Sequence, residues 1–321
     1  MFDDAGDTGP TDSRIGGGRP DYRGRVRIVS LLPSTTEILF AIGAGDDVAG
    51  VTFECDFPAE ARTRRIVSTS AMPEGLSPRE IDDFVADAQR RGEDLYRLEA
   101  DALAGLDPDL VVTQDLCAVC AVDVSVVDDA LSYLGCRADV VTVDPHDVGE
   151  VLESVRRLGE RTGRAAEAGV VVEDLRARLD AVRRAVAGRD RPRVLVLEWT
   201  DPPYAPGHWI PEMVELAGGA SVLGRTGEKS VRVTWEQAVG SEPDVVVCAP
   251  CGFDLDAAAE LAAPVVARFP GVQVWAVDAN ASFARPGPRI VDGVEDLAAI
   301  LHPQADGVSP PRGARRVHAD R

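Results

Sequence analysis

Two pairs of cysteines with C-x-x-C spacing each accompany an apolar run of the sequence. Cys117 and Cys120 come shortly after the run at 110–113, and Cys248 and Cys251 come after the run at 245–247. Paired thiols can hold zinc in a tetrahedral site or cycle between dithiol and disulfide. Because short apolar runs of this kind are typical of buried strands, we expect the thiols to lie where two strands end.

Three interpretations of the cysteines remain open. One is burial as small apolar residues, which we favour for any single cysteine and assign to Cys136. Another is redox chemistry, because Cys120 precedes a predicted helix at 122–135 and a helix N-terminus lowers a thiol pKa. The third is a site for zinc or iron that forms where two parts of the chain meet. Its candidate ligands are Cys55, Cys117, Cys120 and Cys251.

Alternating strand and helix patterns surround these cysteines from residue 25 onward. Apolar runs bounded by turn residues predict strands, and amphipathic segments between them predict helices, including one over 97–106. Ser34 with Glu37 has the spacing of a capping box, and Ser77 with Pro78 has the cap and first residue that helices favour. This alternation predicts an α/β fold with mostly parallel sheets.

The alternation stops after residue 143 and resumes at 191. The segments 147–163 and 164–188 both carry apolar residues at three- to four-residue spacing, with arginine and glutamate between them. Both are therefore predicted to be amphipathic helices. At 1.5 Å per residue the second would be about 36 Å long, enough to join two parts of the protein as a rigid strut.

The two halves of the chain repeat the same pattern. LAGLDPDLVVTQ at 103–114 matches AVGSEPDVVVCA at 238–249, since both end a helix, pass through Pro-Asp and enter an apolar strand. We therefore expect two similar lobes. The expected division is a disordered tail over 1–24, an N-terminal α/β lobe over 25–145, a helical linker over 146–190, a C-terminal α/β lobe over 191–303 and a disordered tail over 304–321.

This organisation resembles the cobalamin and iron-siderophore class of substrate-binding proteins of ABC importers. The stretch RIVSLLPSTTEILFAIGAGDDVAGVT at 27–52 is similar to the opening of that family, and RPGPRIVDGVEDLAAIL at 285–301 resembles its closing signature. The paired Pro-Asp strands are also similar to paired elements of the family. The resemblance covers residues 25–303 and implies two lobes joined by one long helix, with a ligand cleft between the lobes and an ABC importer permease as partner.

Aromatic and polar side chains follow the predicted strands, where ligands bind in open α/β sheets. A tetrapyrrole such as cobalamin needs a broad aromatic cleft with a few hydrogen bonds, whereas a ferric siderophore favours arginines facing its anionic groups. His208 could also coordinate a metal. The candidate ligand-binding residues are Ser34, Thr35, Trp199, Tyr204, His208, Trp209, Trp235, Phe283 and Arg285.

We therefore predict a protein that binds cobalamin or a precursor without catalysing a reaction. One alternative is a protein that binds a metal through its thiols, or a ferric siderophore through Arg285 and Arg289. The other is an enzyme on the same scaffold that uses its C-x-x-C pairs for reduction or ligand exchange. The sequence contains no phosphate-binding glycine loop, nucleophile elbow or H-E-x-x-H motif, which favours binding over catalysis.

The net charge and the hydropathy of the sequence restrict its possible binding partners and its expected cellular compartment. The net charge of −20 argues against nucleic acid, whose phosphates need a basic surface. There is no apolar stretch of 18 residues, and the first 25 residues carry no apolar segment behind a basic start. From these features we expect a cytoplasmic monomer without membrane insertion.

Overall fold

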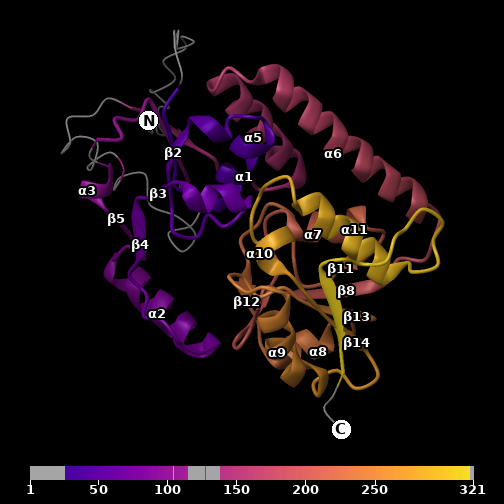
Figure 1. The fold of residues 1–321 in the computed structure, drawn as a ribbon. Helices are drawn as coiled ribbons and strands as arrows, with labels where there is room; N and C mark the ends of the chain where they lie inside the picture. The colour runs from indigo at the N-terminus through magenta and orange to yellow at the C-terminus, as the bar shows by residue number, and fades with distance from the viewer. Residues whose placement is uncertain (1–25, 104, 115–126, 128–137, 319–321) are drawn as a thin grey trace, which may run out of the picture.

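Two five-stranded sheets, one in each half of the chain, form the frame of the computed structural model (Figure 1). The structure describes residues 26–103, 105–114, 127 and 138–318. Cys117, Cys120 and Cys136 lie outside the described residues, so the structure does not address the predictions made for them. The predicted α/β class with two lobes and mostly parallel sheets is confirmed.

The N-terminal lobe is built on a parallel sheet with the order β3-β2-β1-β6-β7. Helix α1 packs beside β1 and β2, and the core on one side of the sheet continues into the helices that lead to the second lobe. Its elements are β1 Ile28–Ser30, α1 Pro33–Ala41, η1 Gly45–Asp47, β2 Val48–Val51, η2 Ala59–Thr63, β3 Arg65–Ile66, α3 Ala100–Leu103, β6 Leu110–Thr113 and β7 Asp139–Thr142.

The C-terminal lobe is built on a sheet with the order β11-β8-β13-β14-β15, parallel except for its last strand. A small antiparallel sheet, β12-β10-β9, adjoins it. Its elements are β8 Arg193–Leu197, β9 Trp199–Thr200, β10 Pro203–Ala205, α7 Ile210–Leu216, β11 Ala220–Ser221, β12 Val231–Arg232, α8 Trp235–Gly240, β13 Val245–Cys248, α9 Leu255–Val266, β14 Gln273–Val277, α10 Ala279–Ser282, α11 Ile290–Leu301 and β15 Ala314–Val317.

The repeated Pro-Asp pattern has the same physical role in both lobes. The carboxylate of Asp109 accepts a hydrogen bond of 2.8 Å from the backbone N–H of Arg27, and Asp244 does the same for Arg193. In each case the backbone N–H of the aspartate also donates to the carbonyl of the arginine, at 2.8 Å. The aspartate thus fixes the register between the first strand of the lobe and its neighbour, β1 with β6 and β8 with β13.

Two consecutive helices connect the lobes, as the sequence predicts. They are α5 Val148–Arg161 and α6 Ala165–Val186, and they pack closely against each other. Helix α6 has 22 residues and is therefore about 33 Å long. It also packs against α11, so it runs from the N-terminal lobe to the C-terminal lobe along one side of the molecule (Figure 1).

The helix-start signals were correct at one position and wrong at the other. Ser77 caps α2 Pro78–Arg91, and Glu80 completes a capping box. In α1, however, the N-cap is Leu32 and Ser34 lies one position inside the helix, where it is buried. With Leu32 as the N-cap, Glu37 is the fifth residue of the helix and lies beyond the third position that a capping box requires, and its carboxylate pairs with two arginines of the other lobe.

Residues 68–98 form an extension of the N-terminal lobe that we call the arm. It consists of β4 Ser68–Ser70 and β5 Tyr96–Leu98, which pair antiparallel, with α2 between them. The helix predicted over 97–106 is therefore only partly correct, because its first residues belong to β5 and only Ala100–Leu103 is helical. In Figure 1 the arm runs from the N-terminal sheet towards β12 of the C-terminal lobe.

The C-terminal segment differs from the disordered tail expected over 304–321. Residues 314–317 form β15, which pairs antiparallel with β14 and covers the edge of the sheet. The carboxylate of Asp296 in α11 accepts hydrogen bonds from the backbone N–H groups of Arg312 and Gly313, at 2.7 and 2.9 Å. These bonds hold the segment in place although it has little apolar periodicity.

Candidate functional site

The lobes contact each other through residues that follow strands of their sheets and through the arm. Three groups of polar or ring contacts cross between them. The first surrounds Glu37 of α1, the second joins the arm to β9, β10 and β12, and the third brings His146 close to His208. Since ligands of open α/β sheets bind at the carboxyl ends of the strands, this region is the candidate site.

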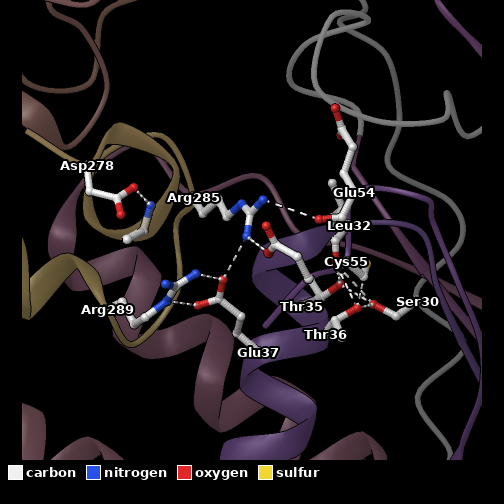
Figure 2. A network of polar contacts seen from close by, with 12 residues as sticks. Ser30, Leu32, Thr35, Thr36, Glu37, Glu54, Cys55, Asp278, Arg285 and Arg289 are labelled. Atoms are coloured by element: carbon white, nitrogen blue, oxygen red, sulfur yellow. Dashed lines mark hydrogen bonds and ion pairs between the residues drawn. The ribbon is translucent and has the colours of Figure 1, made fainter. Parts of the chain in front are cut away.

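Glu37 lies at the centre of the first group, which we call the Glu37 cluster (Figure 2). Arg289 donates from Nε to Oε2 at 2.9 Å and from Nη2 to Oε1 at 2.5 Å, and Arg285 lies 3.4 Å from the same Oε1. Arg285 also pairs with Asp56 and donates to the backbone carbonyl of Glu54 at 3.2 Å. Two arginines before α11 therefore clamp the first helix of the other lobe.

The cluster is desolvated, and this sets its electrostatics. The Glu37 side chain is 2% exposed and that of Arg285 is 10% exposed. Burial raises the pKa of Glu37, against the opposing effect of Arg289 and Arg285. Burial also acts to raise the pKa of Asp56, but the Arg285 guanidinium outweighs it and holds that pKa below the usual value. Arg285, an expected ligand contact, is therefore neutralised by the N-terminal lobe.

The hydroxyl groups at the start of α1 form a buried network next to this cluster. Thr35 Oγ1 lies 2.7 Å from Ser30 Oγ, and Thr36 Oγ1 lies 3.0 Å from the sulfur of Cys55 (Figure 2). Ser34 and Thr35, both expected ligand residues, are 3% and 0% exposed. The Thr35 hydroxyl is bonded within the protein and Ser34 is buried in this structure, and a ligand contact for these two residues stays a prediction.

The arm provides the second group of contacts between the lobes. Trp199 donates from Nε1 to the carbonyl oxygen of Pro78 at 3.2 Å, and Tyr204 donates its hydroxyl to Asp82 at 2.9 Å. Arg232 lies 3.6 Å from the other oxygen of the same carboxylate. Two of the expected ligand-binding aromatic residues thus have their polar ends bound to the opposite lobe.

Aromatic rings are available on both lobes close to these contacts. Phe53, two residues after β2, is 37% exposed and lies against Tyr96 of the arm with ring centres 5.8 Å apart. On the C-terminal lobe, Trp199 lies against Phe253 with ring centres 5.7 Å apart. Phe53 and Phe253 both follow strands but were not among the expected ligand residues.

The remaining expected aromatic residues have structural surroundings. Trp209 and Phe283 are 7% and 0% exposed, and the Trp209 indole donates to the Phe283 carbonyl at 2.8 Å. Trp235 packs on the core of the C-terminal lobe, with the Arg268 guanidinium 5.0 Å from its ring centre. Trp209 and Phe283 are thus buried in this structure and Trp235 is partly buried, and a ligand contact for these three residues stays a prediction.

His208 has an unusual local environment. Its backbone has φ +49, a left-handed conformation that is uncommon for residues other than glycine. Its Nε2 atom is buried and has no hydrogen-bond partner among the described residues, and its ring centre lies 6.4 Å from that of His146. Burial, His146 and Lys229 lower the pKa of His208, so the ring is neutral near pH 7.

The cysteines that the structure describes do not converge on a metal site. Cys55 and Cys248 are buried, and burial raises the pKa of each thiol to about 12. Only Cys251 is exposed among the described cysteines. Within the described part of the chain, no group of three or more His, Cys, Asp or Glu side chains is arranged to hold a metal ion. Cys55 and Cys248 pack in the hydrophobic cores of the two lobes, and a metal site that includes Cys117 and Cys120 stays a prediction because those residues lie outside the described ranges.

Several residues of the site carry no signal that the sequence alone could reveal. Asp82 and His146 are ordinary polar residues of a helix and a loop, and only the folded chain brings them to Tyr204 and His208. Glu37 was recognised, but as a helix cap. The spacing of Arg285 and Arg289 before α11 could have suggested a shared carboxylate partner, although not its identity.

Similar proteins were found over most of the chain. A cobalamin-binding protein of Halobacterium salinarum is 27% identical over 290 residues, covering 86% of this chain and 69% of its own. An uncharacterised ABC transporter substrate-binding lipoprotein of Bacillus subtilis is 26% identical, covering 86% of this chain and 80% of its own. A vitamin B12-binding protein of Vibrio cholerae is 22% identical, and the match covers 86% of this chain and 88% of its own.

Solved structures share the fold. A periplasmic heme-binding protein from Pseudomonas aeruginosa has a TM-score of 0.67 at 20% identity, covering 92% of this chain and 99% of its own. The periplasmic vitamin B12-binding protein of Vibrio cholerae has a TM-score of 0.63 at 23% identity, covering 86% and 96%.

These findings correct the expected location and identify the family. The cytoplasmic assignment is contradicted, because the similar proteins include a substrate-binding lipoprotein and periplasmic binding proteins, and the matching family model is that of periplasmic binding proteins. None of the helices within the described ranges is both long and apolar enough to cross a membrane. Residues 28–273 match the family model described as periplasmic binding protein, and the chain belongs to this family of ligand-binding proteins.

Proposed function

We propose that the protein captures a corrinoid, cobalamin or a precursor, between its lobes and delivers it to an ABC importer permease outside the cytoplasmic membrane. The observation that carries this proposal is the similarity to cobalamin- and vitamin B12-binding proteins, which extends over 86% of the chain in each case. Binding and release would be the whole of its chemistry, with no catalytic step.

The aromatic residues around the lobe contacts support a large, flat ligand. Phe53 with Tyr96 on one lobe and Trp199 with Phe253 on the other are ring pairs with partly exposed members that follow strands or belong to the arm. Aromatic side chains bury large areas against a ring system and use their polar atoms for a few directed hydrogen bonds. This arrangement fits the face of a corrin ring.

Arg285 and Arg289 argue against the ferric-siderophore alternative. Such a ligand needs free guanidinium groups for its carboxylate or catecholate oxygens. Both arginines are already paired with Glu37, and Arg285 is paired with Asp56 as well. Releasing them would leave the buried carboxylate of Glu37 without its arginine partners, at a cost of about 3–5 kcal/mol for a broken buried pair.

Haem is the second candidate ligand. The structural neighbour with a TM-score of 0.67 is named as a heme-binding protein, and haem is also a flat, largely apolar macrocycle. A thiol-based redox enzyme has less support, because the Cys248 thiol is buried with a pKa raised to about 12 and would not form the thiolate that exchange requires.

Tryptophan fluorescence tests the proposal with internal controls. We expect cyanocobalamin to quench the emission of the full chain with saturation at one ligand per chain. The quenching should fall in Trp199→Phe, because this indole follows β8 at the lobe contact. It should persist in Trp275→Phe, because that indole lies in β14 and bonds within its own strand, to Gln273. If cyanocobalamin quenches the emission of Trp199→Phe as strongly as that of the unaltered chain, the ligand binds away from the proposed site.

A further inference from the structure

The polar ends of two aromatic residues of the C-terminal lobe are held by the arm of the N-terminal lobe. Trp199 Nε1 donates to the carbonyl of Pro78 in the first turn of α2, and the Tyr204 hydroxyl donates to Asp82 one turn later. Both acceptors lie on one short segment of one helix. Trp199 Nε1 also donates to the carbonyl of Asp201 in its own lobe, at 3.0 Å. Among the described residues, docking of α2 therefore supplies the only side-chain acceptor for the Tyr204 hydroxyl but one of two acceptors for Trp199.

Asp82 lies at the point where the arm meets two strands at once. Tyr204 of β10 and Arg232 of β12 are directly opposite each other in the antiparallel pair, so their side chains share one face of the small sheet. One oxygen of Asp82 accepts from Tyr204 at 2.9 Å and the other lies 3.6 Å from Arg232. A single carboxylate thus bridges a cross-strand pair of the other lobe.

The burial of these contacts shows which of them fixes the arm. The Asp82 side chain is 12% exposed, so its hydrogen bond from Tyr204 is largely shielded from water, whereas its other partner, Arg232, is 56% exposed. Among the described residues, the other ion pair that joins the arm to the C-terminal lobe, Arg79 with Asp201, has side chains that are 55% and 51% exposed. Exposed pairs of that kind contribute little, whereas a hydrogen bond to a shielded carboxylate contributes substantially.

We infer that Asp82 is a positioning residue of the ligand site, which acts through Tyr204 and Arg232 to couple docking of the arm to the orientation of the aromatic residues. This inference rests on the proposed function, because it concerns the same ligand. With the arm docked, Tyr204 and Trp199 are pre-ordered for a flat ligand, and less conformational entropy is lost when the ligand binds. When the arm is undocked, the small sheet of β9, β10 and β12 loses its contacts with α2.

The kinetics of corrinoid binding separate this role from simple structural support. In Asp82→Ala we expect cyanocobalamin to dissociate about tenfold faster, with the association rate changed much less, because affinity differences among variants of one binding site fall mostly on the dissociation rate. Asp82→Asn should recover part of the loss, since its amide oxygen can still accept from Tyr204 although the charge opposite Arg232 is gone. Asp83→Ala, an exposed neighbour on the same helix, is the matched control and should behave as the unaltered chain.

A double-mutant cycle shows whether Asp82 acts through Tyr204. In the background of Tyr204→Phe, the Asp82→Ala substitution should accelerate dissociation by less than half of the factor seen in the unaltered background. If the two effects multiply independently, the residues are not coupled and the inference is overturned.

A ligand-free measurement tests the contact itself. Burial and Asp82 raise the pKa of Tyr204. We therefore expect the phenolate absorbance of Tyr204, isolated by subtracting the titration of Tyr204→Phe, to appear at lower pH in Asp82→Ala. An unchanged titration would show that the contact is absent in solution and would overturn the inference.

The outcomes distinguish the inference from the function on which it rests. If the unaltered chain binds no corrinoid, the proposed function fails and the role of Asp82 in binding fails with it. If the unaltered chain binds and Asp82→Ala retains the same dissociation rate, only the inference fails. Circular dichroism of each variant identifies any general loss of folding.

Discussion

Glu37 and Arg289 form a two-point ion pair between the lobes, although they are 252 residues apart in the sequence. The geometry is the parallel fork that guanidinium and carboxylate groups favour, and Glu37 is almost completely buried. A second arginine, Arg285, links the same carboxylate to Asp56. The Glu37 cluster is therefore a fixed connection between the lobes, in contrast to the more exposed contacts of the arm.

Removing Arg289 should destabilise the whole protein. We expect Arg289→Ala to lower the free energy of unfolding by about 3 kcal/mol, the lower end of the range for a broken buried pair, because Arg285 remains beside Glu37. Urea unfolding measures this value. Arg183→Ala removes an exposed pair with Asp180 and should change stability by less than about 0.5 kcal/mol. Equal effects of the two substitutions would contradict a buried, fixed connection.

Glu198 should make stability depend on pH. Its carboxylate accepts from Gly207 N and Ser230 Oγ, but burial dominates and raises its pKa to about 7. An acid whose pKa is higher in the folded state binds more protons there, so stability falls as pH rises from about 4.5 to 7. From that shift we expect Glu198→Gln to be more stable than the unaltered chain by about 3 kcal/mol at pH 8.

The same comparison at low pH provides the control for Glu198. Near pH 4 both forms are uncharged at this position, so their thermal midpoints should converge. A constant difference between pH 4 and 8 would show that the Glu198 carboxyl does not titrate in this range and that its effect comes from packing alone.

The cysteines should differ sharply in reactivity. Cys251 is exposed, whereas Cys55 and Cys248 are buried with pKa values raised to about 12. At pH 8 in native buffer, iodoacetamide should modify Cys251 and leave Cys55 and Cys248 unmodified, as read by peptide mass spectrometry. In urea all three should react. Rapid native labelling of Cys248 would contradict its placement in the core and reopen the redox interpretation.

The C-terminal strand should contribute to stability. Deleting residues 312–321 removes β15 and both backbone donors of Asp296, whose pKa burial already raises. We expect a loss of about 2–3 kcal/mol, since a buried carboxyl is left without partners. Calorimetry measures the change, and Asp296→Ala combined with the deletion should be no worse than the deletion alone. An unchanged melting temperature would restore the expectation of a disordered tail.

The sequence was sufficient for the parts of the fold that repeat or that have local causes. The Pro-Asp elements predicted equivalent strands because Asp109 and Asp244 each act on a residue of their own lobe. The capping box at Ser77 and the long helix α6 are likewise local. Contacts between distant segments could not be predicted, and for this reason Glu37 was interpreted as a cap and Asp82 was not noticed.

The cysteines show that sequence-based prediction of the candidate site is limited in the same way. A C-x-x-C pair at the end of a strand states where the residues lie along the chain but not which way they face. In β13 the side chains alternate, so Cys248 points into the core between the sheet and α9. Cys251 lies beyond the strand and is exposed. The pair is therefore divided between two environments.

Isothermal titration of the purified full chain with cyanocobalamin tests the central claim most directly. The account predicts one corrinoid per chain, with a negative heat-capacity change from the burial of apolar surface against the aromatic residues. Haemin should bind more weakly than the corrinoid in the same buffer. Absence of binding heat with cyanocobalamin at several temperatures, together with saturable binding of haemin, would contradict the corrinoid assignment and favour haem as the ligand.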